Sequence, residues 1–163
     1  MQAFLSYSLI QNDLYLISLL SRELLNVGVT SKGTIYSSDP SAELVTMTNY
    51  NIRTCDLFIG ILTGDGSINQ NAMVYQEWEI AIHFNKSRIF LIEDTVAIHP
   101  EFTEPYIIYN RYNPNQVLQQ LRDFVQEKES AKRNKNNLAL IVGGEALIEL
   151  MTHLSKKELK PTG

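Results

Sequence analysis

A glutamate at position 77 lies in a stretch with the pattern of a helix buried on one side. In "NAMVYQEWEIAIHF", residues 71–84, Met73, Ile80 and Phe84 recur at helical spacing, and Glu77 falls within the same stripe. A buried carboxylate is costly unless a partner or a chemical task compensates it. The pattern therefore predicts either a structural acid, favoured by the helix dipole near the first turn, or a carboxylate that acts on a substrate.

The elements around this helix alternate between strand and helix. Five short apolar runs are typical of strands, and the run "DLFIGILT" has the composition of a strand buried on both faces. Helical periodicity appears in "LYLISLLSRELLNVG", where Gly28 is a suitable stop, after Pro40, around Glu77 and in "NPNQVLQQLRDFVQEKE". This alternation predicts an α/β fold with a five-stranded parallel sheet and helices on both faces. The expected strands are Gln2–Ser6, Thr34–Ser37, Asp56–Thr63, Arg88–Asp94 and Pro105–Asn110.

Short polar segments follow the expected strands. In a parallel sheet the carboxyl ends of the strands share one edge, where ligands usually bind. The helix with Glu77 begins at that edge, so Glu77 is expected close to it. The polar residues that follow the first three strands are Ser6, Tyr7 and Ser8; Ser37, Ser38 and Asp39; and Thr63, Gly64 and Asp65.

Composition excludes several classes of protein. The chain has 163 residues, a net charge of -4 and a pI of about 5.4, which does not favour direct binding to nucleic acid. Its single cysteine, Cys55, excludes an intramolecular disulfide, fits a reducing cytosol and is expected in the core. The three histidines are scattered, so no metal site is expected. Neither a secretory signal nor a membrane span is apparent, and a cytoplasmic location is expected.

Three segments together resemble the TIR (Toll/interleukin-1 receptor) domain family: "FLSYS", "CDLFIGILT" and "MVYQEWEIA". The family has a Trp-Val-x-x-Glu type of motif after its third strand, and here Met73, Val74 and Glu77 occupy its positions. The resemblance covers residues 1–128 and implies a flavodoxin-like TIR fold. It also implies self-association through TIR–TIR contacts, a sensor or effector protein as partner, and a role in prokaryotic antiphage signalling.

The resemblance implies an enzyme of the bacterial NAD+-cleaving type. Such an enzyme cleaves the bond between nicotinamide and ribose, with ADP-ribose or a cyclic isomer as product, and the glutamate corresponding to Glu77 is the catalytic residue. The chemistry is consistent with one carboxylate, because nicotinamide leaves without a proton and the ribose gains positive charge. NAD+ is then a substrate, and no cofactor is expected. The candidate substrate-binding residues are Ser6, Tyr7, Ser8, Tyr36, Ser37, Asp39, Thr63 and Trp78.

Two other functions fit parts of the sequence. Nucleoside deoxyribosyltransferases also have a Cys-Asp strand, a Gly-Asp loop and a downstream glutamate that attacks the sugar, and Cys55-Asp56, Gly64-Asp65 and Glu77 follow that order. A TIR scaffold that only recruits partners is the non-catalytic alternative. Trp78 is more commonly a core residue than a platform for a base.

The last part of the chain changes in character. Residues 129–137 are rich in charge and are expected to form a solvated linker. Residues 138–163 contain an apolar stretch, a Gly-Gly pair and an amphipathic helix pattern. They are expected to be a strand and helix extension that serves assembly or begins another domain.

Overall fold

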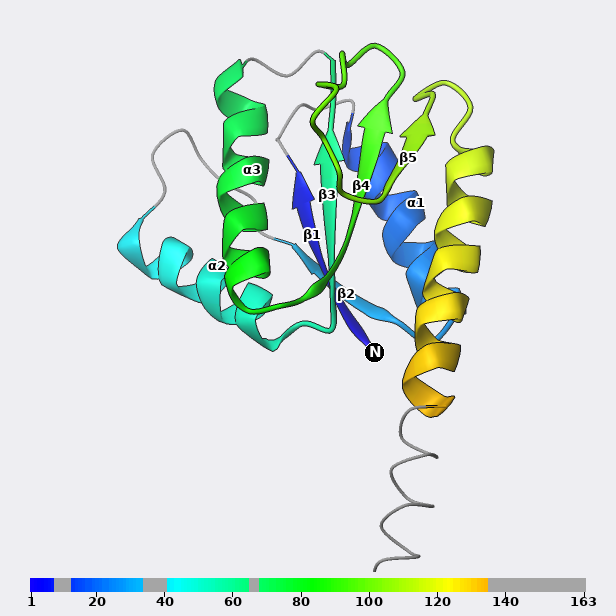
Figure 1. Ribbon diagram of the computed structural model, residues 1–163, viewed down its shortest axis with the longest axis horizontal. Coiled ribbons are helices and arrows are strands. Elements are labelled where there is room, and N and C mark those ends of the chain that lie inside the picture. The colour runs from blue at the N-terminus through cyan, green and yellow to red at the C-terminus, as the bar shows by residue number, and fades with distance from the viewer. Residues whose placement is uncertain (8–12, 34–40, 65–67, 135–163) are drawn as a thin grey trace, which may run out of the picture. The chain divides into compact units, whose positions relative to one another are not determined.

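The fold is a five-stranded sheet in which every neighbouring pair of strands is parallel, in the order β2-β1-β3-β4-β5. A computed structural model describes residues 1–7, 13–33, 41–64 and 68–134. The predicted flavodoxin-like α/β architecture is confirmed, with helices on both faces of the sheet (Figure 1). The strands are β1 Gln2–Tyr7, β2 Thr30–Gly33, β3 Leu57–Leu62, β4 Ser87–Glu93 and β5 Tyr106–Tyr109. The helices are α1 Asp13–Asn26, α2 Ala42–Thr54, α3 Ile68–His83 and a last helix over residues 115–134.

One face of the sheet is covered by α1 and by the first part of the last helix. Leu20 and Leu24 of α1 and Leu121 of the last helix are fully buried against the sheet. The helix α1 ends as expected at Gly28, whose φ of 79° places it in the left-handed region. The amides of Gly28 and Val29 donate to the carbonyls of Leu25 and Leu24, which closes the helix so that the chain turns directly into β2.

The other face is covered by α2 and α3. Ser41 caps α2 by accepting a hydrogen bond from the amide of Leu44 at 3.2 Å. The buried stripe of α3 is Val74, Glu77 and Ala81. The predicted stripe is therefore one residue out of phase at its ends, because Met73 and Ile80 are only partly buried and Phe84 is exposed. On α2 the inward residues are Thr48 and Ile52, whereas Val45 and Met47 are exposed.

The connection from β4 to β5 contains no helix in residues 94–105, all of which the structure describes. This segment returns from the carboxyl end of β4 to the amino end of β5. The ring of Phe102 packs edge-on against that of Phe90, with 5.2 Å between the ring centroids. Glu104 Oε2 pairs with Arg88 Nε at 3.1 Å. The segment thus takes the place of a crossover helix and leaves Tyr106 and Ile108 of β5 largely exposed.

Several predictions fall at or beyond the edges of the described residues. The predicted strand Thr34–Ser37 lies outside them, and β2 is formed by the preceding Thr30–Gly33. Residues 129–134 of the predicted linker are helical, and residues 138–163 lie outside the described part. The chain divides into two compact units, Met1–Val125 and Gln126–Gly163, and the sheet belongs to the first.

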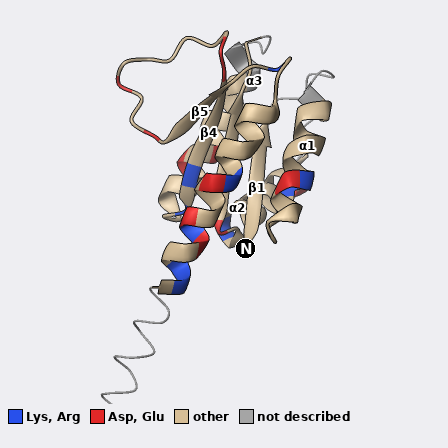
Figure 2. Ribbon diagram, turned by 90° about the vertical axis from the view of Figure 1, so that its right-hand side faces the viewer, with Lys and Arg blue, Asp and Glu red and all other residues tan. Residues whose placement is uncertain are grey.

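Charged residues are absent from β1 and present on α1. In Figure 2 the ribbon of β1 carries no charged residue, whereas α1 carries a positive and a negative segment. The sequence of α1 includes Arg22 and Glu23. Glu23 pairs with Arg122 of the last helix, which joins the two helices on that face. Among the helices of the described ranges, none has the length and apolarity that crossing a bilayer requires.

Candidate functional site

Glu77 is a buried carboxylate on α3, the helix that follows β3. Its residue exposure is 5%, and Val74, one turn earlier, packs over Gly60 of β3. A methyl group added at Gly60 would lie 3.2 Å from Val74 Cγ1 and 2.6 Å from the Phe90 ring, so glycine is needed for α3 to approach the strand. Side chains on a helix tilt toward its N-terminus, so the Glu77 carboxylate leans back toward the carboxyl edge.

Tyr7, the last residue of β1, interacts electrostatically with Glu77. Burial, and then the negative charge of Glu77, raise the pKa of the Tyr7 phenol above its ordinary value. The Tyr7 ring lies over Gly33 of β2, where an added methyl group would come within 2.9 Å of Cε1. The Tyr7 phenol therefore stays protonated at neutral pH, and it interacts with Glu77 electrostatically.

Ser6 and Thr63 are two further polar residues at this edge, and each is 1% exposed. Phe4 packs into the core on the α2 and α3 side, so Ser6, two residues later in the strand, faces the same side. Within the described residues the Ser6 hydroxyl has no hydrogen-bond partner. A buried hydroxyl of this kind usually has a partner, so Ser6 is suited to a group that enters the site from outside.

The side chain of Trp78 is part of an aromatic cluster between α3 and β4. Its ring centroid is 5.9 Å from that of Phe90, in an edge-on arrangement, and 6.2 Å from that of Tyr75. Phe102 and Tyr106 continue the cluster. This position fits the core role that the sequence analysis weighed against base stacking.

Of the predicted site residues, Ser6 and Tyr7 end β1, Thr63 follows β3 and Glu77 lies on α3. Ser6 faces the α3 side of the sheet, whereas Tyr7 packs against the core on the α1 side. The other predicted binding residues lie outside the described part of the chain: Ser8, Tyr36, Ser37 and Asp39. Within the described ranges, no group of three or more His, Cys, Asp or Glu side chains could hold a metal ion.

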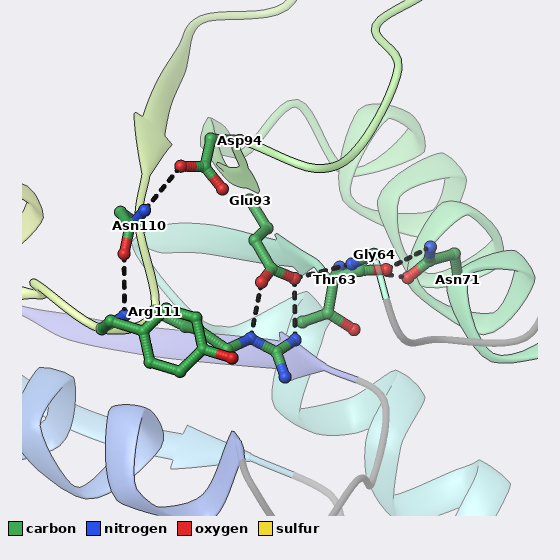
Figure 3. A network of polar contacts seen from close by, with 8 residues as sticks. Thr63, Gly64, Asn71, Glu93, Asp94, Asn110 and Arg111 are labelled. Carbon is green, nitrogen blue, oxygen red and sulfur yellow. Dashed lines mark hydrogen bonds and ion pairs between the residues drawn. The ribbon is translucent and has the colours of Figure 1, made fainter.

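The sequence analysis missed a second buried carboxylate at this edge, Glu93 at the end of β4. Arg111, just after β5, donates to it from Nε to Oε1 at 2.5 Å and from Nη2 to Oε2 at 2.7 Å (Figure 3). The amide of Gly64 donates to Glu93 Oε2 at 2.7 Å. Burial alone would raise the pKa of Glu93, but hydrogen bonds from Arg111 and Gly64 and the charge of Arg111 lower it overall, so Glu93 is ionised.

A signal for these residues was present in the sequence. The predicted fourth and fifth strands also end in polar residues, Glu93-Asp94 and Asn110-Arg111, but only the ends of the first three strands were considered. Asn71 was missed as well. Its side-chain amide donates to the carbonyl of Thr63 at 3.1 Å and accepts from the Thr63 amide at 3.5 Å, as a neighbouring strand would.

The fold and this edge place the chain among flavodoxin-like α/β proteins with a polar carboxyl edge. No protein-family model matches the chain, and no curated protein matches it. Among solved structures, the CMP N-glycosidase BcmB of Clostridium botulinum is 21% identical, with a TM-score of 0.55 over 74% of this chain and 98% of that one. A response regulator receiver domain protein of Bacillus halodurans is 17% identical, with a TM-score of 0.46 over 76% of this chain and 95% of that one. At these identities the likeness shows the fold.

Proposed function

We propose that the chain is an N-glycosidase that cleaves the bond between a base and ribose in a nucleotide, with Glu77 as the catalytic carboxylate. The observation that carries this proposal is the burial of the Glu77 carboxylate on α3, the helix that begins at the edge where parallel sheets bind ligands. The similarity in fold to a CMP N-glycosidase supports the same class of reaction.

The chemistry needs one anionic group beside the sugar. As the bond from C1′ to the base nitrogen lengthens, the ribose acquires positive charge, and a fixed carboxylate stabilises that charge. Water then adds to C1′ and gives ribose 5-phosphate, while the base nitrogen receives a proton. In this proposal the unpaired Ser6 hydroxyl contacts a substrate hydroxyl, and the protonated Tyr7 phenol acts on Glu77 through electrostatics.

NAD+ is the second candidate substrate, and the segment "MVYQEWEIA" favours it because of its resemblance to the TIR motif. Nicotinamide departs as a neutral base without taking a proton, so its release demands less of the site than the release of cytosine. His83 and His99, the histidines of the described ranges, are both exposed, so neither is a buried acid in this site. On this alternative, activity is expected to rise as the chain self-associates.

One experiment distinguishes these functions. Purified protein is incubated separately with CMP, with NAD+ and with a deoxynucleoside plus a second free base, and products are separated by chromatography. Free cytosine supports the main proposal, nicotinamide the NAD+ alternative, and an exchanged base a deoxyribosyltransferase. If neither wild type nor Glu77→Gln formed a product from any of the three at high micromolar protein, an enzymatic role on these substrates would be rejected. An interaction scaffold would then be favoured.

A further inference from the structure

The ion pair of Glu93 and Arg111 joins the ends of three neighbouring strands. Glu93 ends β4, Arg111 follows β5, and the amide that Glu93 also binds belongs to Gly64, just after β3. The side chains of Arg111 and Glu93 are only 13% and 4% exposed. Figure 3 shows the guanidinium and the carboxylate facing each other, with the Gly64 amide beside them on the same carboxylate oxygen that Arg111 Nη2 binds.

Gly64 is packed closely against Thr95. A methyl group added there would lie 2.0 Å from Thr95 Oγ1 and 2.8 Å from Thr95 Cβ. Distances of this size are far below ordinary contact, so only glycine fits between β3 and the turn after β4. A side chain at position 64 would therefore overlap Thr95, next to the Glu93 carboxylate that the Gly64 amide binds.

A second set of contacts continues from this point to the helix that carries Glu77. Thr63 is adjacent to Gly64, and both of its backbone polar groups bind the side chain of Asn71 in α3. Six residues separate Asn71 from Glu77, about 9 Å along a rigid helix. The contacts from Arg111 through Glu93, Gly64, Thr63 and Asn71 are thus continuous up to α3.

Stability alone does not explain an ion pair in this position. Desolvation of two buried charges commonly cancels their attraction, and an apolar pair would hold two strands together as well. The paired guanidinium and carboxylate do provide fixed geometry, because two parallel hydrogen bonds orient both groups. Another pair, Arg88 with Glu104, joins the amino ends of the same strands, away from the carboxyl edge. The remaining hydrogen bond of Arg88 goes to the carbonyl of Lys86.

We propose that Arg111 is a positioning residue for Glu77. By holding Glu93 against Gly64, it fixes the end of β3, and through Thr63 and Asn71 it fixes α3 and the carboxylate that α3 carries. This inference rests on the proposed catalytic role of Glu77, because Arg111 acts on the reaction only through that residue. A displacement of a reacting group by about 1 Å can reduce a rate by on the order of 10²-fold.

The test compares Arg111→Met with Arg88→Met, which removes an ion pair of the same chemistry at the other end of the strands. At 20 °C, with both variants folded by circular dichroism, kcat is expected to fall at least tenfold in Arg111→Met with KM little changed. The kcat of Arg88→Met should stay within twofold of wild type. Arg111→Lys keeps the charge but loses the planar two-point contact, so it should show a smaller loss of kcat and serves if Arg111→Met does not fold. Equal kcat values for wild type and the folded Arg111 variants would overturn the proposal.

Hydrogen exchange provides a readout that is independent of any substrate. The peptide that includes Gly64 and Asn71 should exchange faster in Arg111→Met, or in Arg111→Lys, than in wild type, and Arg88→Met should leave it unchanged. Unchanged exchange in the Arg111 variants would overturn the positioning role even if activity fell. If the wild type released no base from any substrate, the proposed function would fail, while the exchange rates would still decide whether Arg111 fixes this segment.

Discussion

Tyr7 at the end of β1 and Glu77 on α3 interact electrostatically across the carboxyl edge of the sheet. Besides burial, which has the larger effect, the charge of Glu77 raises the pKa of the Tyr7 phenol. This relationship links a phenol that stays protonated at neutral pH to a carboxylate that is almost fully buried. Two glycines leave the space that these positions need. The Tyr7 ring lies over Gly33, and α3, which carries Glu77, approaches β3 closely at Gly60.

Glu77→Gln is expected to reduce base release by on the order of 10²-fold or more, because the substitution removes the charge that faces the developing positive ribose. Size and hydrogen-bonding capacity are retained, so the circular dichroism spectrum should be unchanged. The rate of product formation is followed by chromatography with the substrate that the wild type cleaves. Glu79→Gln is the matched control, since Glu79 is exposed on the same helix and should behave as wild type. A Glu77→Gln variant as fast as wild type would refute the assignment.

Tyr7→Phe is expected to lower kcat by roughly tenfold, because a hydroxyl beside a charged group contributes about 1.5 to 3 kcal/mol when it bonds to that group. The ring over Gly33 is retained, so the melting temperature should change little. Tyr7→Leu serves as the comparison, since it removes the ring as well and should lower both activity and melting temperature. If Tyr7→Phe retained full kcat while Glu77→Gln was inactive, the phenol would have no part in the reaction.

Gly64→Ala is expected to destabilise the protein by about 1 to 3 kcal/mol, because its methyl group would overlap Thr95. Denaturation in guanidinium chloride measures the change in unfolding free energy. The double variant Gly64→Ala with Thr95→Gly removes both atoms that the methyl group meets and should recover part of the loss, as a double-mutant cycle would reveal. Additive effects in that cycle would argue against the contact.

The thiol of Cys55 should make the protein less stable at alkaline pH. Burial raises its pKa from 9.0 to about 11, and the Sγ donates to the carbonyl of Ile52 at 3.1 Å. Because the folded state holds the proton more tightly, the stabilisation is fully present below pH 9 and is lost as the pH rises through 11. Between pH 8 and pH 10.5 the wild type should lose about 2 kcal/mol more than Cys55→Ala. Tyr7 and Tyr75, whose pKa values are also raised, are present in both proteins and cancel in this comparison. Parallel pH profiles for the two proteins would contradict the assignment.

The sequence by itself determined the parallel sheet and the burial of Glu77 on the helix after β3. Apolar runs such as "LFIGIL" in β3 form strands buried on both faces. A helix between two such strands returns the chain to the other end of the sheet, so that the strands run parallel. The stop of α1 at Gly28 was also predictable, because a positive φ at the end of a helix favours glycine. These features depend on neighbouring residues, which the sequence shows directly.

The phase of α3 and the contacts at the edge of the sheet were decided by the tertiary structure. Several stripes of α3 are apolar enough to face inward, and the choice of Val74, Glu77 and Ala81 follows from the space that Gly60 leaves for Val74. The pair of Glu93 and Arg111 depends on β4 and β5 ending at the same edge, so no local pattern joins these residues. Their roles arise from long-range packing, because electrostatic and steric contacts depend on distance in space, whereas helix and strand periodicity depends on distance along the chain.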